Sequence, residues 1–214
     1  MASEVDICNL ALGNIRAASI NSLTEQSIQA QQCKLRYGQL RDQLLRAMPW
    51  QFAHSVKPLS VLSIEVFQWS YAYSRPTDVL LINRLIRNWD TTDAESSPVY
   101  PNNAINNSIH REPVGYEMQN IDGQQVIVSH EADLHIDYQV KVTDPNLFAP
   151  DFISAFSWLL SAELAIPLAG IEGGRQLRQD AYSIYQNYLN EAIANNLNEQ
   201  YHVTPDSEFV TDRW

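Results

Sequence analysis

Apolar residues at helical spacing open the chain. Ser3 and Asp6 have the spacing of a capping box, and the apolar positions behind them predict a first helix over residues 4–16. A second helix is predicted over residues 25–48, because one face is apolar and Pro49 ends it. The apolar face of this second helix consists of Cys33, Tyr37, Leu40, Leu44 and Met48.

The middle of the chain has the period of a β-strand instead. Aromatic residues alternate with other residues at Trp69, Tyr71 and Tyr73. Residues 134–140 alternate in the same way, and the Asp122-Gly123 pair predicts a hairpin turn just before them. Residues 88–113 are polar and without period, which predicts a long loop. The middle therefore predicts a small antiparallel sheet.

Two further helices are expected near the end of the chain. The first begins after Pro150, and Pro167 and Gly170 are predicted to end it. Its apolar positions are Phe152, Phe156, Leu159, Leu160, Ala162 and Leu164. The second is predicted over residues 175–196, and residues 201–214 lose the helical period.

These elements predict an α+β fold that is mainly α. We expect a four-helix core, an inserted small antiparallel β subdomain and an extended C-terminal arm. The expected boundaries are 1–56 for the first two helices of the core, 57–145 for the β-rich insertion, 146–200 for the last two helices, and 201–214 for the arm.

Charge and cysteine content narrow the function classes. The chain of 214 residues has 25 acidic and 14 basic residues, for a formal net charge of -11. That excess argues against a protein that coats DNA, and it suits a surface past which DNA slides without binding. Cys8 and Cys33 are too few for a disulfide framework and are expected to be buried thiols.

The chain shows neither a targeting signal nor a membrane span. The N-terminus lacks a basic region, so no signal peptide is expected, and the protein is expected to be made in a reducing cytoplasm. The longest apolar stretch, Phe152–Leu168, is interrupted by serines, a glutamate and a proline, which indicates a core helix.

Catalytic and metal-binding signatures are not found. The sequence has no nucleophile elbow, phosphate-binding glycine loop or Cys-x-x-Cys motif, so we expect no enzyme activity and no cofactor. A histidine and carboxylate cluster at His130, Glu131, Asp133 and His135 lacks metal-ligand spacing, and no metal is expected. Glu163 lies in the most apolar predicted helix and could act as a buried general acid. Its partner would be Asp137 or Asp151, and the sequence does not place either carboxylate relative to it. Alternatively, Glu163 lies at a helix-helix contact or on the surface and has no catalytic role.

Two segments are candidates for binding surfaces. The polar side of the second helix carries a basic face of Lys34, Arg36, Arg41 and Arg46. This face is either solvated or a contact with an acidic neighbour, such as another copy of the chain. The arm contains apolar side chains in an acidic segment, namely Tyr201, Phe209, Val210 and Trp214. The arm is either a frayed terminus or a docking segment that becomes ordered on a partner.

Several stretches together resemble a known family. They are Cys8–Ile15, Ile20–Glu25, Leu44–Ala53, Tyr71–Asp78 and the run from Tyr138 to Leu168. In these stretches the chain is similar to the head-to-tail adaptors of short-tailed bacteriophages, called tail tubular protein A. The similarity covers most of the chain, and it is weakest at residues 88–113 and in the extreme tail.

The resemblance implies a structural virion protein at the head-tail interface. It implies a homo-oligomeric ring of twelve subunits below the portal, with the C-terminal arm on the portal protein and a tail nozzle protein on the other side. A tail fibre or tailspike is a further partner of this kind of assembly. The genome would pass through the ring during DNA ejection without specific binding, and no membrane contact is implied.

Two other functions remain open from the sequence. One is a tail accessory peptidoglycan hydrolase, which would need two carboxylates beside a cleft. The other is an assembly chaperone, which would leave the particle after use.

Overall fold

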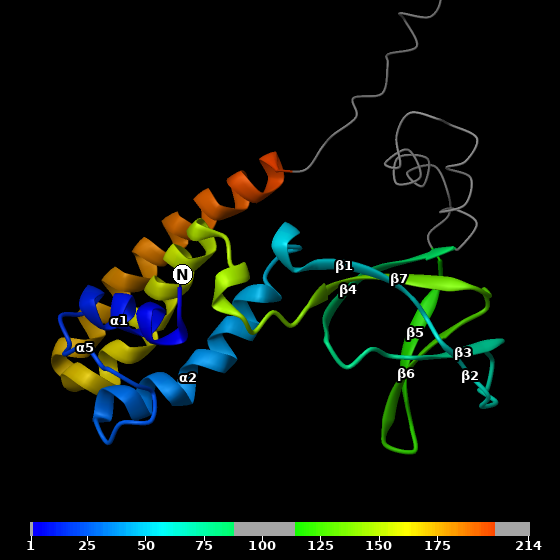
Figure 1. Ribbon diagram of the computed structural model, residues 1–214, viewed down its shortest axis with the longest axis horizontal. Helices are drawn as coiled ribbons and strands as arrows, with labels where there is room; N and C mark the ends of the chain where they lie inside the picture. The colour runs from blue at the N-terminus through cyan, green and yellow to red at the C-terminus, as the bar shows by residue number, and fades with distance from the viewer. Residues whose placement is uncertain (1, 88–113, 200–214) are drawn as a thin grey trace, which may run out of the picture. The chain divides into compact units, whose positions relative to one another are not determined.

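The computed structural model describes residues 2–87 and 114–199, which form two compact units (Figure 1). The helical unit contains residues 2–57, 75–83 and 137–197, and the β unit contains residues 58–74 and the described residues of 84–136 and of 198–214. The predicted arm, 201–214, and the predicted loop, 88–113, lie outside the described residues.

The first helix, α1 (Glu4–Asn14), begins at the predicted capping box. The Ser3 hydroxyl accepts a hydrogen bond from the Asp6 backbone N–H at 3.1 Å, and the Asp6 carboxylate accepts one from the Ser3 N–H at 2.9 Å. These bonds satisfy two donors that a helix start leaves open. The predicted cap is confirmed, and the helix ends two residues earlier than expected.

The second helix, α2 (Ile28–Leu45), starts three residues later than predicted, with Ser27 as its cap. The Ser27 hydroxyl accepts a hydrogen bond from the Ala30 N–H at 3.2 Å. The apolar face expected from the sequence is buried at Cys33, Tyr37, Leu40 and Leu44. The helix ends at Leu45, three residues earlier than predicted, so Met48 lies beyond it and is only partly buried.

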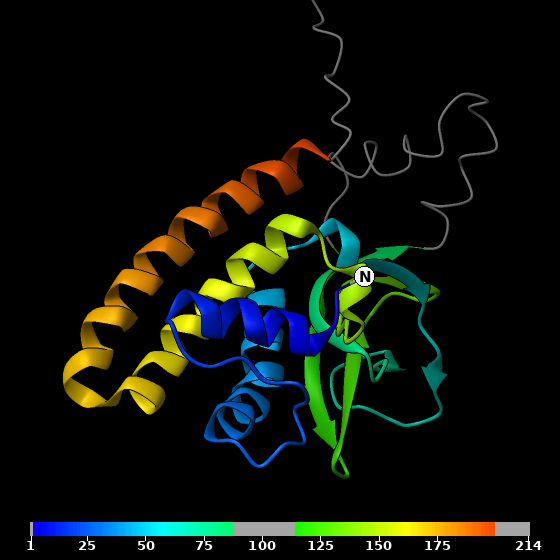
Figure 2. The same cartoon turned by 60° about the vertical axis from the view of Figure 1, so that its left-hand side comes forward.

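One helical segment, α5 (Pro150–Asn198), stands where the third and fourth helices were predicted, and it consists of two helical limbs on either side of a kink at Gly170. Gly170 interrupts the helical conformation with a φ of 77°, and the helix resumes at once. The two limbs fold back beside each other as a hairpin (Figures 1 and 2). A β-carbon at Gly174 would lie 2.7 Å from the Cα of Ile166, so only glycine permits this close approach of the limbs.

The predicted four-helix core is therefore wrong. The described chain has three α-helices and seven strands in two antiparallel sheets, and it is about 49% helical. The physical reason is local. Pro167 removes one backbone N–H donor, and Gly170 has a positive φ. Neither residue introduces a loop between the two limbs.

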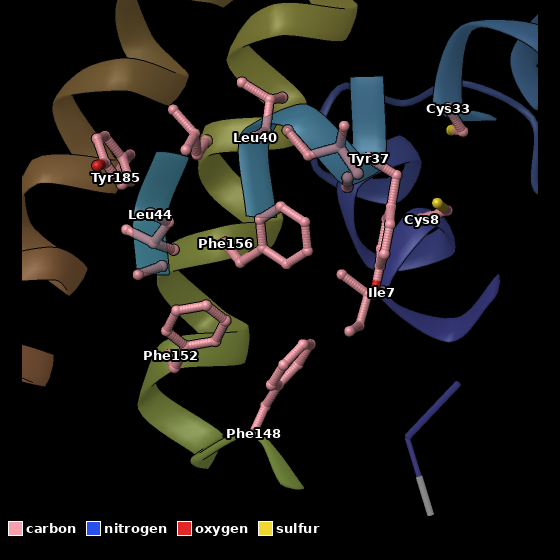
Figure 3. Close-up of a cluster of buried hydrophobic side chains, with 14 of the residues drawn as sticks. Ile7, Cys8, Cys33, Tyr37, Leu40, Leu44, Phe148, Phe152, Phe156 and Tyr185 are labelled. Carbon is pink, nitrogen blue, oxygen red and sulfur yellow. The ribbon is translucent and has the colours of Figure 1, made fainter. Parts of the chain in front are cut away.

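A large aromatic cluster forms the core of the helical unit (Figure 3). The rings of Phe152 and Phe156 on α5 contact rings from other elements. Phe152 meets Trp50 with centroids 5.0 Å apart, and Phe156 meets Tyr37 at 5.0 Å. The Trp50 indole N–H also donates to the Leu44 carbonyl at 3.0 Å, which closes the chain over the end of α2.

Two sheets complete the fold. One has the strand order β1-β7-β4 and the other β2-β3-β6-β5. The strands are β1 (His54–Pro58), β2 (Val61–Leu62), β3 (Tyr71–Ser74), β4 (Val79–Arg87), β5 (Tyr116–Ile121), β6 (Gln124–Ser129) and β7 (Leu134–Val140). Two 3-10 turns, η1 (Gln51–Ala53) and η4 (Pro145–Leu147), precede β1 and α5 respectively.

The predicted hairpin is the β5–β6 turn. Asp122 and Gly123 both have positive φ, at 52° and 82°, as a two-residue hairpin turn of this type requires. Antiparallel pairing then places Met118 opposite Ile127, and Ile127 opposite Tyr73 on β3. The hairpin prediction is confirmed.

One helix has the length and apolar composition of a membrane-crossing segment, and it is α5. However, 56% of its most apolar stretch is buried inside the protein. This burial is typical of a core helix.

Candidate functional site

An open groove lies within the helical unit, between α2 and the two limbs of α5. Its volume is about 960 Å³. We call it the α2–α5 groove. Its charged lining residues are Arg36, Glu163, Arg175 and Arg178, and its apolar ones include Leu35, Leu40 and Tyr182.

Helical spacing and the bend of α5 place these side chains together. Arg36 and Leu40 are four residues apart, so both lie on the side of α2 that faces the groove. Arg178 and Glu163 are fifteen residues apart, on different limbs, and only the bend brings them within 2.8 Å of each other. No local pattern in the sequence indicates this pairing.

The groove carries a surplus of positive charge. Among the described residues that line it, Glu163 is the single carboxylate, and its charge is balanced by the ion pair with Arg178. Arg36 donates a hydrogen bond to the neutral side chain of Gln32. Arg175 is exposed and has no ion-pair partner within the described ranges. Two arginines are therefore left to attract an anionic group in a protein whose net charge is -11.

The predicted basic face of α2 does not form one continuous surface. Arg41 is buried, and its guanidinium binds the Asp42 carboxylate through Nε at 2.9 Å and Nη2 at 2.7 Å. Lys141 contacts the same carboxylate at 2.6 Å. Arg36 lines the groove, whereas Lys34 and Arg46 are exposed. The structure thus assigns different surroundings to the four cations.

The carboxylates that could have assisted Glu163 are engaged elsewhere in the helical unit. Asp137 is buried, and its Oδ1 lies 2.8 Å from Nε2 of His54 and accepts a hydrogen bond from Asn83 at 2.9 Å. Asp151 accepts from the Phe152 backbone N–H at the start of α5. Neither lines the α2–α5 groove, so the structure offers no acid and base pair there.

A second polar network, which sequence reasoning missed, joins three elements of the helical unit. The Asp78 carboxylate accepts hydrogen bonds from Lys57 at 3.1 Å and from the Tyr138 hydroxyl at 3.1 Å. Burial alone would raise the pKa of Asp78, but these hydrogen bonds lower it below its usual value. The hydrogen bonds of Lys57 with Tyr138 and with Asp78 raise the pKa of the lysine. The residues are far apart in sequence, so no spacing signal exists.

Members of the histidine and carboxylate cluster of the β unit make a ring-stacking contact and an ion pair. The His130 ring stacks on Trp69 with centroids 4.7 Å apart. Glu131 pairs with Arg87 at 3.0 Å, and this contact lowers the pKa of Glu131. Among the described residues, no group of three or more His, Cys, Asp or Glu side chains is placed to hold a metal ion.

Cys8 and Cys33 lie beside each other where α1 packs on α2 (Figure 3). Both thiols are fully buried. The hydrogen bond with Cys33, together with burial, raises the pKa of Cys8 well above its usual value. The complete burial of both thiols agrees with the expected packing role.

Comparison with known proteins does not identify the chain: no family model matches it, and no curated protein matches it either. The resemblance to head-to-tail adaptors therefore rests on the sequence stretches given above. The arm residues Tyr201, Phe209, Val210 and Trp214 lie outside the described part of the chain.

Proposed function

We propose that this protein is a non-enzymatic head-to-tail adaptor of a short-tailed bacteriophage virion. In this role it forms a ring, joins the portal protein to the tail nozzle, and lines part of the channel through which DNA leaves. The resemblance over Cys8–Ile15, Leu44–Ala53 and the run from Tyr138 to Leu168 names this assembly.

The structural observation that supports assembly is an apolar stripe left open on α2. Ile28 and Leu35 are seven residues apart, which places them on the same side of the helix. Their exposed fractions are 63% and 69%. Two large aliphatic side chains exposed on the same side of one helix are what a subunit contact would cover.

Charge supports the same role. With a net charge of -11, the protein surface repels DNA at close range, within a screening length of about 8 Å at physiological salt. A channel wall needs this property if the genome is to pass without binding.

The test is mass photometry of the full chain, alone and mixed with its cognate portal ring. We expect a monomer alone and a ring-sized gain of mass on mixing. Ile28→Asp, which lies outside the α2–α5 groove, should reduce that gain, because it places a charge in the proposed contact, whereas Val61→Asp serves as a matched exposed control in the β unit. No association at micromolar concentration contradicts the adaptor.

Neither alternative is favoured by an observation within the described residues. A glycoside hydrolase needs two carboxylates about 5–9.5 Å apart, and the α2–α5 groove has only Glu163. A cell-wall clearing assay with Glu163→Gln as control tests that function. An assembly chaperone would be missing from purified virions, and an adaptor would be present.

A further inference from the structure

The α2–α5 groove differs in charge from the chain around it. The protein has 25 acidic and 14 basic residues, yet the groove is lined by three arginines and a single glutamate. Glu163 forms an ion pair with Arg178. The positive charges of Arg36 and Arg175 are therefore not balanced by a carboxylate among the lining residues. An occupant of this groove should be acidic.

The groove also exposes apolar surface. Leu35 is 69% exposed and Tyr182 46% exposed, and both line the groove. An occupant that covers these side chains should carry apolar or aromatic groups between its acids.

The segment 200–214 of the same chain has both properties. Its acids are Asp206, Glu208 and Asp212, and its aromatic residues are Tyr201, Phe209 and Trp214. Arg213 is the one lysine or arginine in the segment. Its composition is therefore complementary to the groove in charge and in apolar character.

The last turns of α5 lie beside the chain that follows α2. Asn196 donates a hydrogen bond to the Pro49 carbonyl at 3.1 Å and accepts one from the Gln51 N–H at 2.8 Å. Both partners directly follow α2, whose residues from Leu35 to Gln43 line the groove. The segment therefore begins beside the end of the helix that forms one wall.

The length of the segment is sufficient. Arg178 lies 20 residues before Asn198, which is about 30 Å along the helix axis. Phe209 lies 11 residues after Asn198, and an extended chain of that length spans about 36 Å. Phe209 and its neighbouring acids can thus reach Tyr182, Arg178 and Arg175.

We propose that the α2–α5 groove holds residues 200–214 of its own chain before assembly. Connection through the same chain gives the segment a high effective concentration at the groove, so weak ion pairs suffice to hold it. If the protein is the adaptor proposed above, this contact keeps the aromatic arm from the portal until the portal competes for it. The groove contact itself does not depend on that role.

Photo-crosslinking in the full chain tests the proposal. A p-benzoylphenylalanine placed at position 209 should crosslink to groove residues within one chain, which mass spectrometry of the monomer band can map. Arg175→Glu should reduce the yield by about fivefold, because it replaces attraction by repulsion of the acidic segment. Arg175→Lys should retain most of it.

The matched control is Arg46→Glu, which reverses another exposed cation of the helical unit outside the groove lining. It should leave the yield unchanged, and thermal melting should show that all variants are folded. The yield should also fall when NaCl is raised from about 0.05 to about 0.5 M, because salt screens exposed charges.

Three outcomes overturn the proposal: crosslinks that map away from the groove, an unchanged yield in Arg175→Glu, or crosslinks found only between two chains. The last outcome would place the segment in the groove of a second copy. None of these measurements involves the portal. A failed portal association in mass photometry therefore does not contradict the groove contact, and a failed crosslink does not contradict the adaptor function.

Discussion

The helical unit and the β unit bury their apolar residues in different ways. The helical unit has one large cluster in which the rings of Trp50, Phe152 and Phe156 lie in contact. A cluster of the β unit has only Ala72, Val126 and Val128 at its centre. The β unit also leaves Phe67 85% exposed. The β unit does bury large side chains completely, namely Tyr73, Ile127, Leu134 and Ile136. The difference between the described parts of the two units is that the helical unit packs several aromatic rings against one another, whereas the buried side chains of the β unit are mostly aliphatic and lie on paired strands.

The largest expected effect is in the aromatic cluster. Phe156→Ala should lower the free energy of unfolding by about 3–5 kcal/mol, because it leaves a cavity between Tyr37 and Phe152. Urea denaturation of the variant and the parent chain measures this. A loss below about 1 kcal/mol would mean that the helical unit collapses into the space and that its packing is not the main source of its stability.

The next effect concerns the bend of α5. Gly174→Ala should cost about 1–3 kcal/mol, because the new β-carbon would lie 2.7 Å from the Cα of Ile166. The matched control is Gly173→Ala, where no atom lies within 4 Å of the new β-carbon. Since alanine favours a helix over glycine, the control should be neutral or stabilising by up to about 1 kcal/mol. Equal effects at the two positions would contradict the close approach of the limbs.

A smaller effect is expected in the β unit. Val128→Ala removes two buried carbon atoms and should cost about 1–2 kcal/mol. Val61→Ala, at an exposed position of the same sheet, is the control and should change stability by less than about 0.5 kcal/mol. If Val128→Ala costs as much as Phe156→Ala, the contrast between the two units fails.

The smallest effect is a dependence on pH in the helical unit. The pKa of Asp78 is lower in the folded chain than its usual value, so its ionised form stabilises the fold above about pH 4. That stabilisation is lost as pH falls through the lowered pKa. Asp78→Asn should therefore reduce Tm at pH 7, and the difference from the parent should shrink toward pH 2.5.

Thermal melting between pH 7 and pH 2.5 measures this difference. Glu65→Gln, which removes an exposed carboxylate of the β unit, is the control and should leave Tm nearly unchanged. A difference between Asp78→Asn and the parent that stays constant down to pH 2.5 would show that Lys57 and Tyr138 do not act through the ionised carboxylate.

Local features of the fold could be predicted from the sequence alone. The capping box at Ser3, the apolar face of α2 and the hairpin at Asp122-Gly123 each follow from residues within one turn or one element. Such features depend on nearby backbone donors and on φ preferences, which the local sequence determines. The sequence also identified Cys8 and Cys33 as buried thiols.

The number of helices could not be predicted in this way. Pro167 and Gly170 predicted a helix end, and the helical backbone is interrupted at Gly170. The second limb of α5 nevertheless follows at once, with no loop between the limbs. The close contact of Gly174 with Ile166 and the Arg178–Glu163 ion pair stabilise the packing of the two limbs. Neither contact is visible as a spacing along the chain.

What the sequence by itself determined about this protein is its acidic charge and local features such as the cap at Ser3, the apolar face of α2 and the hairpin at Asp122-Gly123. Only the tertiary structure decided that the two limbs of α5 pack on each other, that Arg41 is buried against Asp42, and that Arg36 and Arg175 line the same groove. The reason is that these arrangements join residues far apart in sequence, and their free energy comes from packing that no local pattern encodes.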